Sequence, residues 1–315
     1  MSFEQLVYKL NSTDWHNVVY DIHKVLKIEL QTPKGFIRFI KEEREQARKD
    51  AIDRKLDRFL DAGIYDLDAR VNDCIREIET INNFYNIALQ YELIDTLLSS
   101  KVPFRYPNLC IAKDFLEDDS ISSQSYNRLC AVLYQICNQS LSQGSKSNAG
   151  IVGEGMVRAI FNAVGLKKDV HFSEQYKSKK GSDTDFVLPC VGNFDESNLE
   201  VLVAAQLSTN DRGRLASSEL KQGGVRYLVT GNGLDSSTKQ LSSIGTQILQ
   251  SFKSDNIRIA CFEDEINLEK NRVQEMLNKS SGIAYKDYEE RLNYLGSHVM
   301  SFAIFAKKLE RFNNH

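Results

Sequence analysis

The sequence predicts an α/β protein in which a mixed β-sheet, flanked by helices, lies between an all-helical N-terminal region and a helical C-terminal extension. Up to about residue 143, apolar residues recur at the spacing of three and four that is typical of helices. From 144 to 265 short strand-like runs alternate with helix-like ones, and after 266 the helical spacing returns. We therefore expect three parts, residues 1–143, 144–265 and 266–315.

Composition restricts the class of protein. The 315 residues are 42% hydrophobic and 26% charged, which is typical of a globular, water-soluble chain. No apolar run approaches the roughly 18 residues that cross a bilayer, and Met1 to Leu10 lacks the pattern of a secretory signal, so we expect a cytoplasmic protein without a membrane partner. The six cysteines form no CxxC pair and the five histidines show no ligand spacing, which argues against a zinc site and predicts reduced thiols.

Net charge gives a weaker indication. A formal charge of -3 creates no field that would draw the whole molecule to a polyanion, so nucleic-acid binding would need a local basic surface. The charged run 41–58 could form such a basic face for phosphates. A solvated helix with ion pairs at a spacing of four residues is the favoured interpretation of the same run.

The helical N-terminal region is predicted from three apolar series at helical spacing. They are Val18, Val19, Ile22, Val25 and Leu26, then Phe36, Ile37 and Ile40, then Ile75, Ile78, Ile81, Phe84 and Ile87. Residues 140–150, with the sequence SLSQGSKSNAG, are rich in Ser, Gly and Asn. We expect these residues to form a loop that separates the helical region from the sheet.

The sheet region is predicted from shorter elements. An amphipathic helix over 151–164 ends at Gly165. The strand-like runs are 170–176, 184–189, 199–207, 226–230 and 257–262, and helices are expected over 211–222 and 238–252. The run LEVLVAAQL at 199–207 has the continuous apolar character of a central strand that is covered on both faces.

The chemistry-bearing residues gather at strand ends. Asp185 opens one predicted strand, and after a hairpin the next strand ends in Ala204, Ala205 and Gln206. Side chains alternate between the faces of a strand, so Ala204 and Gln206 share one face. We expect the hairpin to bring Asp185 close to Gln206.

This region contains, in order, a helix with the acidic residue Glu154, a strand with Asp-Phe at 185–186, a hairpin, and an apolar strand with a polar end. That order of elements resembles the core of the PD-(D/E)XK nucleases. The layout looks most like type II restriction endonucleases, and the resemblance covers about Lys146 to Glu263. In that family the second strand carries Glu-X-Lys, where this chain has Ala204 and Gln206. Another group of restriction enzymes has Gln in place of the Lys.

The layout is closest to the branch that cuts CCGG and CCNGG sites, in which the acidic residue lies on the following helix. That position corresponds here to Glu219, thirteen residues after Gln206. The same branch reads bases with charged residues just after the lysine. The corresponding candidates for DNA binding in this chain are Asn210, Asp211, Arg212 and Arg214.

The resemblance implies a restriction endonuclease-like fold and Mg²⁺-dependent, sequence-specific hydrolysis of double-stranded DNA within a restriction-modification system. Asp185 and Glu219 are the expected metal ligands, Gln206 and Glu154 are further catalytic candidates, and Lys180 and Lys146 are further DNA-binding candidates. Gln206 neither takes a proton nor carries charge, so it can only orient water or phosphate. No organic cofactor is expected. Cutting both strands of a palindrome needs two active sites, which predicts a homodimer, with the helical N-terminal region as dimer interface, DNA clamp or both.

Structural explanations stand beside these roles. Asp185 could be a turn residue, Glu219 an exposed helix residue, Gln206 an ordinary buried amide, and Glu154 the i,i+4 partner of Arg158. Glu200 is interpreted as a surface carboxylate at the start of a strand. Two other functions remain open: a catalytically weakened or inactive DNA-binding relative, and a non-enzymatic helical interaction protein.

Overall fold

The computed structural model describes residues 1–31, 35–99, 102, 104–177, 183–190, 198–206, 224–231 and 246–314. The chain divides into two compact units. The helical unit comprises Met1–Ala51 and Thr80–Asn148, and the sheet unit comprises Ile52–Glu79 and Ala149–His315. No described helix is long and apolar enough to cross a membrane.

The first half of the chain is helical, as predicted. Its helices are α1 (Phe3–Asn11), α2 (Trp15–Gln31), α3 (Phe36–Asp57), α4 (Leu67–Ser99), α5 (Pro107–Glu117) and α6 (Ser123–Ala163). Two of the three apolar series supply buried residues of the helical unit's core, among them Ile22, Leu26, Phe36 and Ile40. In the third series, Phe84 and Ile87 are exposed. Helix α1 begins with a capping box in which Ser2 and Gln5 exchange hydrogen bonds.

Charged residues of α3 form ion pairs, as the favoured interpretation of the run 41–58 predicts. Within the helix, Arg38 pairs with Glu42 and Arg48 with Glu45. In the sheet unit, Arg58 follows the end of α3 and contacts Glu77 of α4 at 2.7 Å. These contacts account for much of the charge on this helix without a bound phosphate.

The expected loop at 140–150 is wrong, because residues 123–163 form one continuous helix, α6. The expected boundary at 143/144 therefore lies inside a helix. Ser, Asn and Gly lower helix propensity by about 1 kcal/mol or less each, and a helix already formed on both sides is extended cooperatively through them. The compact units also differ from the three expected parts, since 52–79 and the C-terminal extension both belong to the sheet unit.

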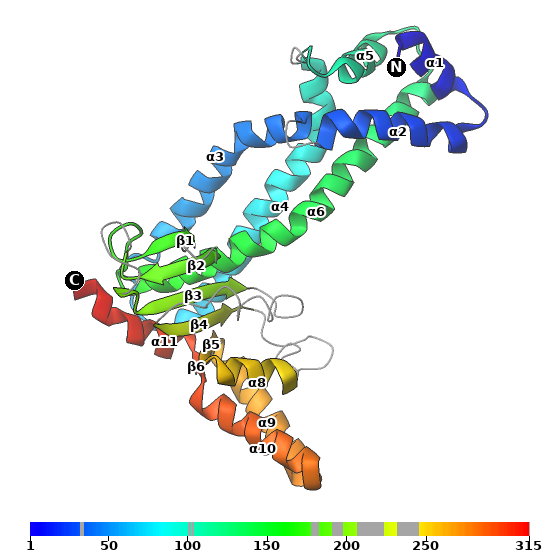
Figure 1. Cartoon of the computed structure of the whole chain (residues 1–315). Helices are drawn as coiled ribbons and strands as arrows, with labels where there is room; N and C mark the ends of the chain where they lie inside the picture. Colours follow the sequence, from blue (N-terminus) through cyan, green and yellow to red (C-terminus); the bar gives the residue numbers. More distant parts are fainter. Residues whose placement is uncertain are drawn as a thin grey trace. The chain divides into compact units, whose positions relative to one another are not determined.

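In the described part of the chain, six strands form one mixed sheet in the order β1-β2-β3-β4-β5-β6. They are β1 (Ser173–Lys177), β2 (Asp183–Leu188), β3 (Val201–Gln206), β4 (Val225–Thr230), β5 (Ile257–Cys261) and β6 (Val299–Ser301). Strands β1 to β3 are antiparallel, and β3 to β6 are parallel. Figure 1 shows the strands side by side in chain order. The sheet and its flanking helices form the mixed α/β layout that the sequence predicts.

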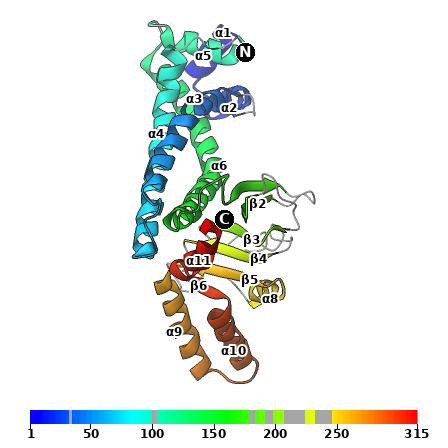
Figure 2. The ribbon, with the colours of Figure 1, turned by 90° about the vertical axis from the view of Figure 1, so that its left-hand side faces the viewer.

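Helices cover both faces of the sheet, so β3 is buried along its whole length. On one face, Phe186 contacts Phe161 of α6, and Tyr227 contacts Phe305 of α11 (Phe302–Leu309). On the other face, Leu202 and Leu228 belong to a core that includes residues of α8 (Thr246–Ser254), α9 (Glu263–Lys279) and α10 (Gly282–Ser297). Figure 2 shows α11 and α8 on opposite sides of the strands.

Helix α6 ends where Gly165 predicts. Gly165 has φ +77°, a left-handed conformation that glycine adopts without strain. The N–H of Leu166 donates to the carbonyl of Phe161 at 3.0 Å, and that of Gly165 to Asn162 at 3.0 Å, which is a Schellman cap. The chain ends in the short 3-10 helix η2 (Glu310–Asn314). All six cysteines lie in the described residues as free thiols, and four are buried.

Candidate active site

Asp185 lies on β2 at the edge of the core, and its carboxylate is held by the neighbouring strand. The register pairs Phe186 with Val203, so Asp185 lies beside Ala204 and Ala205 near the carboxyl end of β3. The Ala205 N–H donates to Asp185 Oδ2 at 2.7 Å. A carboxylate that accepts a backbone hydrogen bond has a fixed direction, so Asp185 is more than the turn residue that the sequence also allowed.

Gln206 is the last residue of β3 and is buried, with 6% of its surface exposed. It lies beside Thr230 in the parallel register of β3 and β4, and Thr230 is fully buried. The expected proximity of Asp185 and Gln206 follows from this arrangement, because Asp185 binds the backbone of the residue just before Gln206. The structure places a neutral amide at the position for which the resemblance implies a lysine.

Helix α6 brings Glu154 to the same strand end. A Cβ atom added to Gly153 would lie 3.4 Å from the carbonyl carbon of Ala205 and 3.5 Å from the Gln206 nitrogen, so the helix packs closely on β3 at this point. Burial first, and the nearby charges of Asp185 and Glu174 second, raise the pKa of Glu154 to about 7. Two carboxyl groups on different elements therefore interact electrostatically near the end of β3.

Glu154 has a neutral hydrogen-bond donor as its partner. Gln175 Nε2 of β1 donates to Glu154 Oε1 at 2.7 Å. Arg158, which the i,i+4 spacing makes a possible partner of Glu154, forms its ion pairs with Asp53 and Glu174. The positive charge of Arg158 still lowers the pKa of Glu154, but by less than burial and the two carboxylates raise it.

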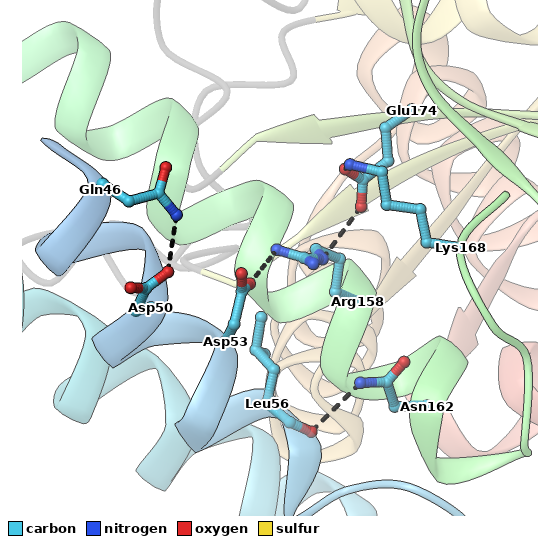
Figure 3. A network of polar contacts seen from close by, with 8 residues as sticks. All are labelled: Gln46, Asp50, Asp53, Leu56, Arg158, Asn162, Lys168 and Glu174. Carbon is cyan, nitrogen blue, oxygen red and sulfur yellow. Dashed lines mark hydrogen bonds and ion pairs between the residues drawn. The ribbon is translucent and has the colours of Figure 1, made fainter.

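An ion-pair network fixes the part of α6 that carries Glu154. Arg158 lies between Asp53 of α3 and Glu174 of β1, with N–O distances of 2.9 Å to each (Figure 3). Lys168 Nζ contacts the other oxygen of Glu174 at 2.6 Å. One turn further along α6, Asn162 Nδ2 donates to the carbonyl of Leu56 at 3.1 Å (Figure 3). Helix α6 is therefore joined to both α3 and β1.

Three of the predicted site residues thus come together: Asp185, Gln206 and Glu154. Glu219, Asn210, Asp211, Arg212, Arg214 and Lys180 lie outside the described residues. Lys146 lies on helix α6 instead of the loop that the sequence predicts, and its side chain is outside the described part of the chain. Glu200 precedes β3 and pairs with Arg311 at 2.8 Å, which confirms it as a surface carboxylate.

Carboxylate oxygens are the ligands that Mg²⁺ prefers, and Asp185 and Glu154 supply them from two elements. Among the described residues, no group of three His, Cys, Asp or Glu side chains is arranged to hold a metal ion. A further ligand would have to come from beyond them, and Glu219 is the residue that the resemblance implies. Sequence reasoning missed Gln175 and Glu174, because no spacing rule shows that β1 contacts Glu154 and Arg158.

No protein-family model and no curated protein matches the chain. Among solved structures, it is similar to metal-depleted Ecl18kI in complex with uncleaved, modified DNA, with a TM-score of 0.43 and 15% identity over 94% of this chain and 84% of that chain. It is also similar to metal-depleted Ecl18kI in complex with uncleaved DNA, with a TM-score of 0.45 and 15% identity over 94% of this chain and 83% of that chain.

Proposed function

We propose that the chain is a type II restriction endonuclease that hydrolyses double-stranded DNA at a short, specific site with Mg²⁺. The observation that carries the proposal is that Asp185 of β2 and Glu154 of α6 lie near the same end of β3, where the charge of Asp185 helps to raise the pKa of Glu154 to about 7. Carboxyl groups that raise one another's pKa are costly for a fold, and they are typical of a site for a divalent cation.

Asp185, Glu154 and Glu219 are the proposed ligands of Mg²⁺. When bound, the cation would neutralise charge that develops on the scissile phosphate and activate water. Asp185 keeps its direction through the Ala205 N–H, and Glu154 keeps its direction through Gln175. Gln206 is proposed to orient water or phosphate by hydrogen bonds, because an amide cannot act as a base. Asn210, Asp211, Arg212, Arg214, Lys180 and Lys146 remain the proposed DNA contacts.

The decisive experiment incubates the purified chain with phage-sized DNA in Mg²⁺ and, separately, in Mn²⁺. We expect discrete fragments with the parent chain and none with Asp185→Ala or Asp185→Asn. The second variant keeps an acceptor for the Ala205 N–H, so loss of cleavage there reports on charge rather than on folding. Glu200→Ala is the matched control, because it removes a carboxylate from the opposite end of β3 and should leave the fragments unchanged.

A second candidate is a DNA-binding relative that has lost catalysis. Ala204 and Gln206, at the positions of Glu and Lys in the family pattern, favour it. This alternative predicts site-specific binding in Ca²⁺ and intact DNA in both Mg²⁺ and Mn²⁺. Its binding should weaken steeply with salt, because phosphate contacts release counterions. A non-enzymatic interaction protein would bind DNA under neither condition.

A further inference from the structure

Gln175 combines a rare backbone conformation with a contact to the candidate active site. Its φ is +50°, in the left-handed region that non-glycine residues seldom adopt. The register of β1 and β2 pairs Glu174 with Phe186 and Tyr176 with Thr184. Gln175 therefore lies opposite Asp185 across the ladder, at the point where β1 passes the proposed metal ligand.

The left-handed conformation changes where two consecutive side chains of β1 go. In a regular strand, neighbouring side chains point to opposite faces of the sheet. Here Glu174 contacts Arg158 at 2.9 Å and Gln175 contacts Glu154 at 2.7 Å, and both of these partners belong to α6. Two successive residues of one strand thus reach two residues of one helix that are a single turn apart.

We propose that Gln175 is a positioning residue of the candidate metal centre, which holds the Glu154 carboxylate beside Asp185 through the Nε2 to Oε1 hydrogen bond. The inference rests on the proposed function. The chemistry of the side chain suits this role, because an amide N–H fixes one carboxylate oxygen and leaves the other oxygen and the negative charge for a cation. Strained backbone of this kind persists where the surrounding structure holds it, often at functional sites.

The test compares Gln175→Gly with a control at the same kind of backbone position. Asn256 has φ +51° in the turn before β5, so Asn256→Gly relaxes an equivalent conformation away from the site. We expect both variants to melt at or above the temperature of the parent. In calorimetric titrations with Mn²⁺ alone, we expect about tenfold weaker binding for Gln175→Gly and no change for Asn256→Gly.

The outcomes separate the two proposals. If the parent binds Mn²⁺ and cleaves DNA while Gln175→Gly does both equally well, the positioning role is overturned and the proposed function stands. If the parent binds no Mn²⁺ and cuts no DNA, both are overturned. Weaker Mn²⁺ binding by both glycine variants would also count against the inference, because it would assign the effect to the backbone change rather than to the amide.

Discussion

Glu154 carries a carboxyl group whose pKa is raised to about 7 by burial first and by Asp185 and Glu174 second. Nothing in its immediate sequence, Gly-Glu-Gly, distinguishes it from a surface glutamate. The packing of Gly153 on the backbone of Ala205, where an added Cβ atom would already be in van der Waals contact at 3.4 Å, brings Glu154 into this environment. The unusual pKa therefore comes from the packing of α6 on the sheet.

The raised pKa of Glu154 predicts that its ionisation destabilises the fold. The carboxyl group ionises at about pH 4.5 in the unfolded chain and at about pH 7 in the folded chain, so the unfavourable effect develops between these values and is complete above pH 7. Glu154→Gln removes it. In urea unfolding with EDTA, we expect the free energy of unfolding of the variant to exceed that of the parent by about 1 to 3 kcal/mol at pH 8. Below pH 4.5 we expect the two free energies to be equal. A difference that does not change with pH would contradict the raised pKa.

The same carboxyl group predicts pH-dependent metal binding. A cation binds the ionised form, so its affinity should rise as the pH increases through the pKa of Glu154, about 7. Titration of the parent with Mn²⁺ should give an apparent affinity roughly tenfold higher at pH 8 than at pH 6. Glu154→Gln should bind more weakly and lose most of this dependence. An equally steep pH profile in the variant would place the titrating group elsewhere.

Some of the candidate site could be predicted from the sequence and some could not. The proximity of Asp185 and Gln206 is predictable, because strand alternation and antiparallel pairing of consecutive strands determine where the strand ends meet. Gln175 could not be found in this way. Its side chain contacts Glu154 from a residue with φ +50°, and no pattern of apolar and polar residues predicts a left-handed backbone within a strand.

At the scale of elements, the hairpin of α9 and α10 is held by a buried charge. Glu269 is fully buried and binds Arg272 at 2.8 Å and Arg291 at 2.7 Å. Burial alone would raise its pKa, but the hydrogen bond from Arg272 and the charge of Arg291 outweigh it, and the net pKa is lowered. A buried carboxylate with two guanidinium partners stabilises the fold only while it is ionised.

Glu269→Gln should therefore destabilise the chain by about 3 kcal/mol at neutral pH, because two arginines lose their charged partner. The lowered pKa means that the parent loses this stabilisation as the pH falls below 4.5 and passes through the folded-state value. The difference in free energy of unfolding between parent and variant should therefore decrease over that pH range. Urea unfolding at pH 7 and pH 3 measures it, with the exposed Glu275→Gln of the same helix as control. A constant difference would contradict the ionic origin.

Replacing either of two glycines by alanine should change the stability of the fold, in opposite directions, because one follows a helix end and the other lies within a helix. Gly165→Ala should destabilise the fold by about 1 to 3 kcal/mol, because φ is +77° and a Cβ atom would lie 2.6 Å from Asp61 Oδ1 and 2.7 Å from Asn313 Nδ2. Gly296 lies within α10 with nothing within 4 Å of a Cβ, so Gly296→Ala should stabilise by about 0.5 to 1 kcal/mol. Melting temperatures measure both, and shifts of the same sign would contradict the argument.

The elements themselves were largely predictable, and the exceptions have physical causes. Strand β3 was predicted nearly to the residue, because a continuous apolar run is typical of a strand covered on both faces. Strand β6 was missed, since three residues between two helices give no alternation to detect, and it is fixed by its pairing with β5. The helix through 140–150 was missed because local composition says little about a helix that is stabilised on both sides.

At the scale of the whole molecule, the proposed nuclease has one active site per chain, but cutting both strands of a duplex needs two active sites. A duplex has two strands of opposite polarity, so a palindromic site is cut on both strands most simply by two copies related by a two-fold axis. A monomer would have to stay on the DNA between the two cuts by long-range electrostatic attraction. The net charge of -3 makes that attraction unfavourable. We therefore propose a homodimer as the active form.

The dimer predicts both a mass and a product distribution. Sedimentation of the purified chain should give about twice 35.9 kDa at micromolar concentration. On a supercoiled plasmid with one site, two active sites acting in one encounter should convert the circle directly to the linear form. A mixed dimer with one Asp185→Ala subunit keeps the duplex bound but cuts a single strand, so nicked circles should accumulate. A monomeric mass together with nicked circles from the parent itself would contradict the dimer, because each strand would then be cut in a separate encounter.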